Sequence, residues 1–174
     1  MNRSKRVDDS RTTMTELIMP NDTNPLGNLM GGNLMHWMDI AGGICAGKHC
    51  EAYVVTASVD HVSFQHPIKL GSVISIHAQV TRAFRTSVEV YLEVYVSDFD
   101  GKNTRKCNHA YMTFVALDED RKKPIEVPQL QAVTPTEIQL YESAVRRREV
   151  RMILSGRMKP EEAKDLKAYF GDMN

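Results

Sequence analysis

Residues 28–47 read NLMGGNLMHWMDIAGGICAG, and this stretch decides which fold the chain can adopt. Its large apolar side chains recur at helical spacing and predict one helix with a buried stripe, made of Leu34, Trp37, Met38, Ala41, Ile44 and Cys45. Asp39 lies on the other side of this helix, among Gly32, Met35, His36, Gly42 and Gly43. Glycine costs about 1 kcal/mol relative to alanine inside a helix, so a face this poor in side-chain bulk indicates close approach by another chain or a ligand. Asp39 is therefore either a functional carboxylate or a group that satisfies a donor where the helix meets a sheet.

The composition describes one folded domain without a strong overall charge. The chain has 174 residues, of which 42% are hydrophobic and 25% are charged, as in a single globular domain. Lysine plus arginine and aspartate plus glutamate both number 22, so no net field favours nucleic acid or an anionic membrane. We therefore expect no nucleic-acid partner and no membrane partner, and any anionic ligand must be held by local charges.

The amino-terminal segment and the cysteines bear on cellular location. Residues 1–11 are polar, lack the apolar core of a signal peptide and are expected to be disordered or loosely ordered. No apolar run is long enough to span a bilayer, so the sequence predicts a cytoplasmic protein. Cys45, Cys50 and Cys107 have apolar or strand-like neighbours, which favours buried reduced thiols over a disulfide framework. Cys45, His49 and Cys50 lack a second ligand cluster at tetrahedral spacing, so no metal and no other cofactor are expected.

Five strand patterns accompany the predicted helix. Residues 12–19 form the first, and a loop rich in proline and asparagine separates them from the helix. Residues 53–64 follow the helix, and their apolar phase shifts near Asp60 and His61, which predicts a β-bulge there. Residues 74–81 and 88–96 alternate apolar and polar side chains around a short turn and predict a hairpin. Residues 105–117 complete a predicted antiparallel sheet of about five strands.

The carboxyl-terminal part of the sequence changes to a helical period. Thr134 and Glu137 have the spacing of a capping box, with proline at the first helical position, and Gly156 marks the predicted end of that helix. Residues 159–170 form a second, shorter amphipathic segment. The sequence is thus predicted to divide into a loosely ordered segment 1–11, a domain 12–130 and a helical tail 131–174.

One long apolar helix followed by an antiparallel sheet with a continuous inward face predicts a sheet wrapped around a central helix. This α+β architecture, here with a carboxyl-terminal helical extension, is the hotdog fold. One helix cannot cover a five-stranded sheet, and unpaired edge strands favour continuation into a second copy, so a homodimer is expected. The small-residue face of the helix would then meet the partner.

Two longer motifs carry a resemblance to a known family. Residues 24–39, NPLGNLMGGNLMHWMD, resemble the active-site signature of single-domain bacterial acyl-CoA thioesterases related to brain acyl-CoA hydrolase. Residues 56–71, TASVDHVSFQHPIKLG, and the turn Arg85–Ser87 resemble later segments of the same family. The resemblance implies hydrolysis of acyl-CoA to a carboxylic acid and coenzyme A, with a dimer as the smallest active unit and a hexamer of three dimers. It also implies that Asp39 acts as general base, or alternatively as a nucleophile that forms an anhydride, while Asn24 of the partner subunit orients water.

Thioester hydrolysis also requires an oxyanion site and a place for the phosphates of coenzyme A. Gly31 and Gly32 leave backbone N–H groups unobstructed at the positive end of the predicted helix, and Gly32 is the preferred donor. For the phosphates we favour a set at the predicted hairpin, with Lys69 in reserve; the set consists of Arg85, Thr86 and Ser87, supported by Arg82.

Two other functions fit the same motifs. A hydratase or dehydratase acting on acyl thioesters would pair a histidine with a carboxylate, and His36 is the only histidine on the predicted face of Asp39. A non-catalytic acyl-CoA-binding module would bind without hydrolysis. His61 and His66 are interpreted as bulge and turn residues, and the sequence has no Gly-x-Ser-x-Gly motif for a serine nucleophile.

Overall fold

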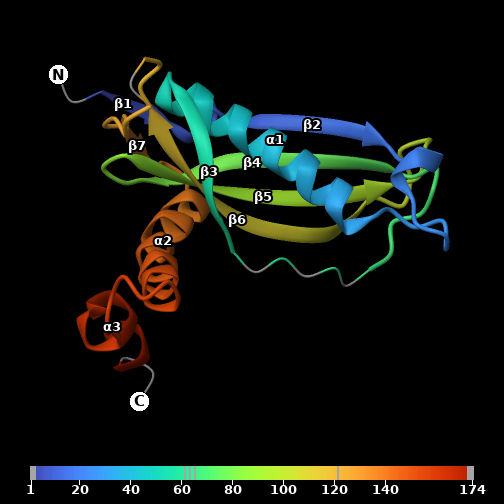
Figure 1. Ribbon diagram of the computed structural model, residues 1–174. Coiled ribbons are helices and arrows are strands. Elements are labelled where there is room, and N and C mark those ends of the chain that lie inside the picture. The colour runs from blue at the N-terminus through green and yellow to red at the C-terminus, as the bar shows by residue number, and fades with distance from the viewer. Residues whose placement is uncertain (1–2, 61, 63, 65, 121, 172–174) are drawn as a thin grey trace. The chain divides into compact units, whose positions relative to one another are not determined.

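The computed structural model describes residues 3–60, 62, 64, 66–120 and 122–171, which divide into two compact units, Met1–Gln131 and Ala132–Asn174. In the first unit the helix α1 (Gly31–Cys50) lies across one face of a five-stranded antiparallel sheet (Figure 1). The strands are β2 (Thr12–Leu17), β3 (Tyr53–Val59), β4 (Val73–Ala83), β5 (Ser87–Ser97) and β6 (Arg105–Leu117). Their order is β2-β4-β5-β6-β3, so β2 and β3 are the two edges. The predicted hotdog fold is confirmed.

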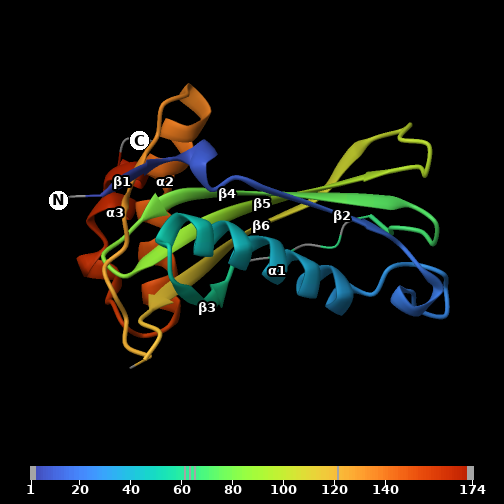
Figure 2. The ribbon, with the colours of Figure 1, turned by 90° about the horizontal axis from the view of Figure 1, so that it is seen from above.

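The core lies between α1 and the alternating apolar side chains of the central strands. Met38, Ala41 and Cys45 of the helix have no exposed surface, and Leu92 and Phe114 of the sheet are buried against that side. Strands β4, β5 and β6 supply the rest of the core through the period-two pattern seen in the sequence; among these residues are Ile74, Ile76, Val80, Val90, Ala110 and Met112. The second view shows that α1 covers one side of the sheet (Figure 2).

Two residues of α1, Ile44 and Gly42, lie on a different side of the helix from the one predicted. Ile44, which the sequence places in the buried stripe, is 46% exposed. Gly42, predicted on the face toward a partner, is buried against the sheet, where a Cβ would lie 2.9 Å from the ring of Phe114. The helix therefore uses glycine to approach the sheet, and its exposed face carries His36, Asp39 and Ile40 instead.

Strand β3 is shorter than predicted, and its irregularity lies elsewhere. Thr56 pairs with Phe114 and Ser58 with Thr113, so Ala57 is the extra residue of the bulge. The predicted bulge position included Asp60, which follows the strand and donates its backbone N–H to Tyr111 O at 2.8 Å; His61 lies outside the described residues. The bulge therefore lies three residues before Asp60, in the part of β3 where the apolar alternation looked regular.

Residues 3–11 are ordered, whereas the sequence predicted a disordered or loosely ordered segment. Strand β1 (Ser4–Arg6) pairs in parallel with β7 (Gln129–Gln131), and a short 3-10 turn (Val7–Asp9) follows. Val7 is only 2% exposed. The partner strand lies more than 120 residues away in the sequence, so local polarity could not reveal it.

The second unit contains α2 (Pro135–Leu154), a 3-10 turn (Pro160–Glu162) and α3 (Lys164–Gly171). The predicted capping box is present: Glu137 N donates to Thr134 Oγ1 at 3.3 Å, and Thr134 N donates to Glu137 Oε2 at 3.0 Å. Gly156 has φ +70°, a left-handed conformation suited to glycine after a helix end. None of the helices within the described ranges has the length and apolar character needed to cross a membrane.

The cysteines are free and buried, as predicted. Burial raises the pKa of the Cys45 thiol to about 11 and that of Cys50 to about 12, so both stay protonated near neutral pH. His49, which lies between these two cysteines in the sequence, is also buried. Its Nε2 donates a hydrogen bond to Pro128 O at 2.9 Å. In the described part of the chain, no group of three or more metal-binding side chains is gathered.

Replacing Gly42 by alanine should destabilise the protein by about 1–3 kcal/mol, because the new methyl group would overlap the buried ring of Phe114. Gly43→Ala is the matched control, since its Cβ would meet that ring at an ordinary 3.8 Å and alanine favours the helix by up to about 1 kcal/mol. Urea unfolding measures both variants. Equal stability of the two would contradict the packing described for Gly42.

The stability of the protein should fall as the solution becomes acidic, because burial lowers the pKa of His49 below its ordinary value. Below about pH 6.5 the unfolded chain binds a proton that the folded state does not. The free energy of unfolding should therefore decrease by up to about 1.4 kcal/mol per pH unit from about pH 6.5 downward, until the lower folded pKa is reached. Urea unfolding of wild type and His49→Gln between pH 7.5 and pH 5 measures this pH dependence. If the free energy of unfolding falls equally with pH in both proteins, His49 is not its cause.

Candidate active site

Asp39 is held by a side chain from the neighbouring edge strand. Thr56 of β3 donates its hydroxyl to Asp39 Oδ1 at 2.5 Å. Both residues are exposed in the single chain, and Thr56 directly precedes the bulge residue Ala57. A hydrogen bond to a charged oxygen fixes which way that carboxylate faces, because it leaves the second oxygen as the open acceptor. Asp39 is therefore a positioned carboxylate on the open side of α1.

Asn24 lies in a loop before the helix that is built around its own side chain. Its Oδ1 accepts from Leu26 N at 3.0 Å and from Asn28 N at 3.2 Å, which is an Asx-type turn across Pro25. The backbone closes the same turn, because Asn24 N donates to Asn28 O at 2.8 Å. With the carbonyl oxygen occupied by two donors, the amide Nδ2 is the end of the Asn24 side chain left for another acceptor.

The first turn of α1 presents backbone donors. Asn33 N and Leu34 N both donate to Met30 O. The N–H groups of Gly31 and Gly32 come before the first hydrogen-bonded turn, so the helix itself offers them no acceptor. A Cβ on Gly32 would meet no atom within 4 Å, and a Cβ on Gly31 would lie 3.2 Å from the ring of Phe64. Gly32 therefore offers the more open N–H, at the positive end of a helix of 20 residues.

One chain does not bring these three groups together. Gly31 and Asp39 lie eight residues apart on one straight helix, which is about 12 Å along its axis at about 1.5 Å per residue. The loop that carries Asn24 joins the end of β2 to the start of α1, at the end of the sheet where β2 finishes (Figure 1). Within one chain, the Asp39–Thr56 pair is therefore separated from the backbone donors at the start of α1.

The predicted phosphate-binding turn lies at the opposite end of the sheet. Residues 84–87 form the β4–β5 turn, closed by Phe84 N donating to Ser87 O at 2.8 Å. Arg85 O accepts from Val127 N at 3.1 Å, next to strand β7, and the guanidinium of Arg82 lies 5.9 Å from the centre of the Phe84 ring. Within a single chain, Arg82, Arg85, Thr86 and Ser87 are therefore far from the Asn24 loop, whereas the reserve residue Lys69 pairs with Asn28 of that loop.

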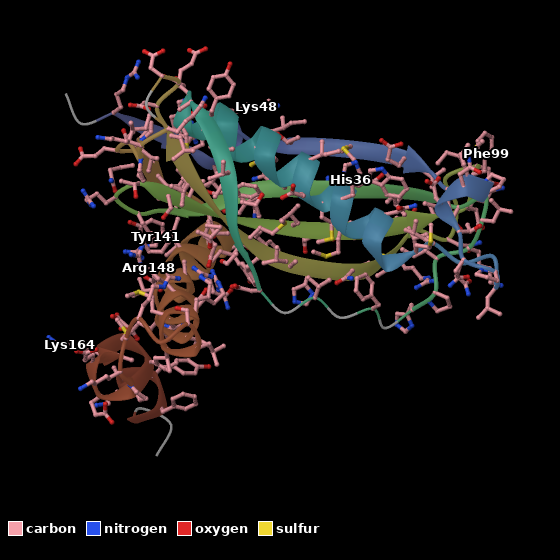
Figure 3. The ribbon with its side chains drawn as sticks, viewed as in Figure 1. His36, Lys48, Phe99, Tyr141, Arg148 and Lys164 are labelled. Carbon is pink, nitrogen blue, oxygen red and sulfur yellow. The ribbon has the colours of Figure 1, made fainter. Side chains whose placement is uncertain are left out.

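Two histidines were considered for other roles, and one of them, His36, lies on the same exposed face of α1 as Asp39, one helical turn before it. His36 is exposed on α1 (Figure 3), and within the described residues no hydrogen bond joins it to Asp39. His66 is exposed after the end of β3. Thr56 is the residue that sequence reasoning missed. It was quoted as part of a strand motif, but only its three-dimensional pairing with Asp39 distinguishes it from other strand threonines.

An apolar surface surrounds the Asp39–Thr56 pair. It is formed by one face of α1 and by β3, whose outer edge has no partner strand in the sheet. Five of its side chains are large and at least 38% exposed: Ile40, Ile44, Tyr53, Val55 and Val59. Such a contiguous apolar surface around an unpaired strand edge is typical of a protein interface.

Comparison with known proteins assigns a family to this arrangement. The sequence model of the thioesterase superfamily matches residues 26–99. The uncharacterized acyl-CoA thioester hydrolase YkhA of Bacillus subtilis is 34% identical over 139 residues, which cover 80% of this chain and 80% of that protein. The chain belongs to the acyl-CoA thioesterase family. A solved apo-hexameric acyl-CoA thioesterase has a TM-score of 0.84 and 37% identity, covering 88% of this chain and 97% of that one.

Another acyl-CoA thioesterase structure bears on the individual residues. The acyl-CoA hydrolase of Staphylococcus aureus was solved with butyryl coenzyme A, coenzyme A and coenzyme A disulfide; it has a TM-score of 0.80 and 36% identity, covering 88% of this chain and 95% of that one. Structures also exist of its variants in which an aspartate, an asparagine or a threonine is replaced by alanine. The asparagine precedes the aspartate by fifteen residues and the threonine follows it by 17, which are the separations of Asn24, Asp39 and Thr56 here.

Proposed function

We propose that this protein hydrolyses acyl-CoA to a free carboxylic acid and coenzyme A. The observation that carries the proposal is the Asp39–Thr56 hydrogen bond on the open face of α1, in a chain of the acyl-CoA thioesterase family. The reaction proposed uses water and the side chains of the protein and requires no bound metal or cofactor. A cytoplasmic location, where thiols stay reduced, suits the three free cysteines.

In the proposed mechanism Asp39 acts as general base. A water molecule attacks the thioester carbonyl carbon while the open oxygen of Asp39 accepts a proton from it, and the carbonyl oxygen becomes an oxyanion. Backbone N–H groups at Gly31 and Gly32 stabilise that oxyanion, and Nδ2 of Asn24 donates to the attacking water and holds its position. The carbon–sulfur bond then breaks, and the departing sulfur takes the proton from Asp39. Direct attack by Asp39 to form an anhydride is the alternative first step.

The site is completed by a second copy of the chain. Because one chain holds Asp39 about two helical turns from the donors at the helix start, Asn24 and the glycines are supplied by the partner subunit. The apolar surface of α1 and β3 forms the dimer interface, where the unpaired edge of β3 continues the sheet into its copy. Burial in this interface removes water from the surroundings of Asp39. By similarity to hexameric relatives, three such dimers assemble into a hexamer.

The wild-type protein should release thiol from acyl-CoA, and a panel of saturated acyl chains of graded length measures this. Asp39→Asn should lower kcat about 100-fold or more, because the base is lost, while Asp100→Asn, at an exposed turn, serves as the control. Formation of hydroxyacyl-CoA from an enoyl-CoA would favour the hydratase reading. Tight acyl-CoA binding without thiol release would favour the binding module.

Mixing two inactive variants tests the shared site in the same assay. Asp39→Asn and Asn24→Ala homodimers should both be nearly inactive, but their mixed dimer contains one site with both native residues. After subunit exchange in equal amounts, activity should recover to about a quarter of wild type. Absence of recovery despite proven exchange would place both residues of a site on one chain.

Thr56→Val should lower kcat about tenfold or more, because the hydrogen bond that orients the carboxylate is removed and bonds to charged groups contribute about 1.5–3 kcal/mol. Thr56→Ser keeps the hydroxyl and should retain most of the activity. If the serine and valine variants lose activity equally, the methyl group rather than the hydroxyl would be the important part of Thr56.

A further inference from the structure

A buried amide on the inner face of the sheet carries a donor without a partner. Asn108 of β6 is 7% exposed, and its Nδ2 has no hydrogen-bond partner among the residues that the structure describes. Its Oδ1 accepts from His109 N at 2.6 Å, which identifies the oxygen end of the amide, because the amide nitrogen cannot accept from an N–H group. The unpartnered atom is therefore the N–H donor.

The strand register places this donor on the side of the sheet that faces α1. Asn108 pairs with Val94 of β5, and residues directly opposite each other in a sheet lie on the same face. Val94 is buried, as are Ala110 and Met112, which follow Asn108 at two-residue steps along β6. Asn108 therefore takes a place in the apolar layer between the helix and the sheet.

An amide in this layer costs stability unless something else supplies an acceptor. A buried donor without a partner destabilises the folded state, whereas an apolar side chain of similar size at this position would not. A buried water is a poor partner, because such a water typically makes about three hydrogen bonds. The strand neighbours on this face, Val94 and Ala110, have apolar side chains that offer it none. The acceptor is therefore expected from a bound molecule.

Asn108 lies beneath the half of α1 that begins with the proposed oxyanion donors. A Cβ on Gly42 would lie 3.6 Å from Leu92 Cδ2, so the middle of the helix sits over this residue of β5. From there α1 toward its start and β5 toward its end run to the same end of the sheet (Figure 1). Val94 follows Leu92 in that direction, and Asn108 is its partner. The amide is thus on the Gly31 side of the Gly42 contact.

Two further side chains lie around the same part of the layer. Phe64, from the segment after β3, packs its ring on the first turn of α1, where a Cβ on Gly31 would lie 3.2 Å from it. That segment leaves β6 at Tyr111, whose carbonyl oxygen accepts from Asp60 N at 2.8 Å. Met38 of α1 is buried in the layer, and its unbranched side chain can rearrange to admit an acyl chain. A thioester held at the start of α1 can therefore extend its acyl chain beneath the helix toward the amide.

We propose that Nδ2 of Asn108 selects acyl chains that carry a carbonyl oxygen beyond the thioester. The inference rests on the proposed function and adds the class of substrate, which is oxoacyl-CoA in preference to the unsubstituted acyl-CoA of the same length. A carbonyl oxygen only accepts, so it matches a lone donor. A hydroxyl would bring a hydrogen that needs an acceptor of its own, and a carboxylate would bring a charge that one neutral donor cannot offset.

The experiment compares acyl-CoA substrates of one chain length in which the oxo group is moved along the chain. Wild type should show one position at which kcat/KM is about tenfold higher than for the unsubstituted chain, the equivalent of one buried hydrogen bond. Asn108→Leu removes the donor and should lower this ratio to about one. Equal values of kcat/KM at every position in wild type would overturn the inference.

Met112→Leu is the matched control, since it changes another inward-facing side chain of β6 without removing a polar group. It should keep the wild-type ratio, and loss of the ratio in both variants would assign it to packing of the layer and reject the inference. A purely structural role of Asn108 would lower kcat/KM of Asn108→Leu equally for all substrates, which also rejects it. Asn108→Ala, which cannot overfill the layer, is used if circular dichroism shows that the leucine variant does not fold.

Failure of this inference is distinguishable from failure of the proposed function. If wild type hydrolyses unsubstituted acyl-CoA and prefers no oxoacyl-CoA, only the inference is wrong. If wild type hydrolyses neither class, the proposed function fails, and calorimetry decides the inference separately. Wild type should then bind the matching oxoacyl-CoA about tenfold more tightly than the unsubstituted chain, and Asn108→Leu should bind both equally. Equal affinities in wild type would overturn it.

Discussion

The close approach of α1 to the sheet governs the rest of this structure. At residue 42 the helix meets the ring of Phe114 at a distance that leaves no room for a side chain. This contact presses one face of α1 into the concave apolar layer and leaves the opposite face open. Asp39 stands on the open face, close enough to the edge strand for Thr56 to reach it. The arrangement of the carboxylate thus follows from how tightly the helix packs behind it.

The same geometry leaves part of the apolar surface of a single chain uncovered. Strand β3 pairs with β6 on one side only, and among the described residues no strand pairs with its outer edge, which lies next to exposed isoleucine and valine side chains. A second copy can satisfy the strand edge and the apolar surface together. It would also enclose the carboxylate in the new interface, so assembly and formation of the site would be one event.

The sequence predicted those features that depend on local pattern. The long helix, the alternating strands β4, β5 and β6, and the Thr134 capping box are all encoded within a few neighbouring residues. Features that depend on distant partners were missed or misplaced. The strand β1 that precedes Val7 pairs with the distant β7, and on α1 it is Gly42 rather than Ile44 that packs against the sheet, at Phe114.

The residues of the candidate site also differ in whether the sequence or only the structure reveals them. Asp39 and Asn24 stand out from their sequence context, and family resemblance adds their proposed roles. Thr56 became visible only when the structure placed it against Asp39. The turn at Arg85 has suitable residues, but nothing in a linear sequence says at which end of a folded sheet a turn will lie.

The turn around Asn24 also bears on chemical ageing of the protein. Asparagine deamidates when the backbone nitrogen of the following residue attacks the side-chain carbonyl and closes a five-membered imide ring. The following residue here is Pro25, whose nitrogen carries no hydrogen and cannot form that neutral ring. The same carbonyl is already engaged by two backbone donors. An amide in this position is therefore protected against slow conversion to aspartate through that ring, which would place a negative charge where the proposed mechanism uses an N–H donor.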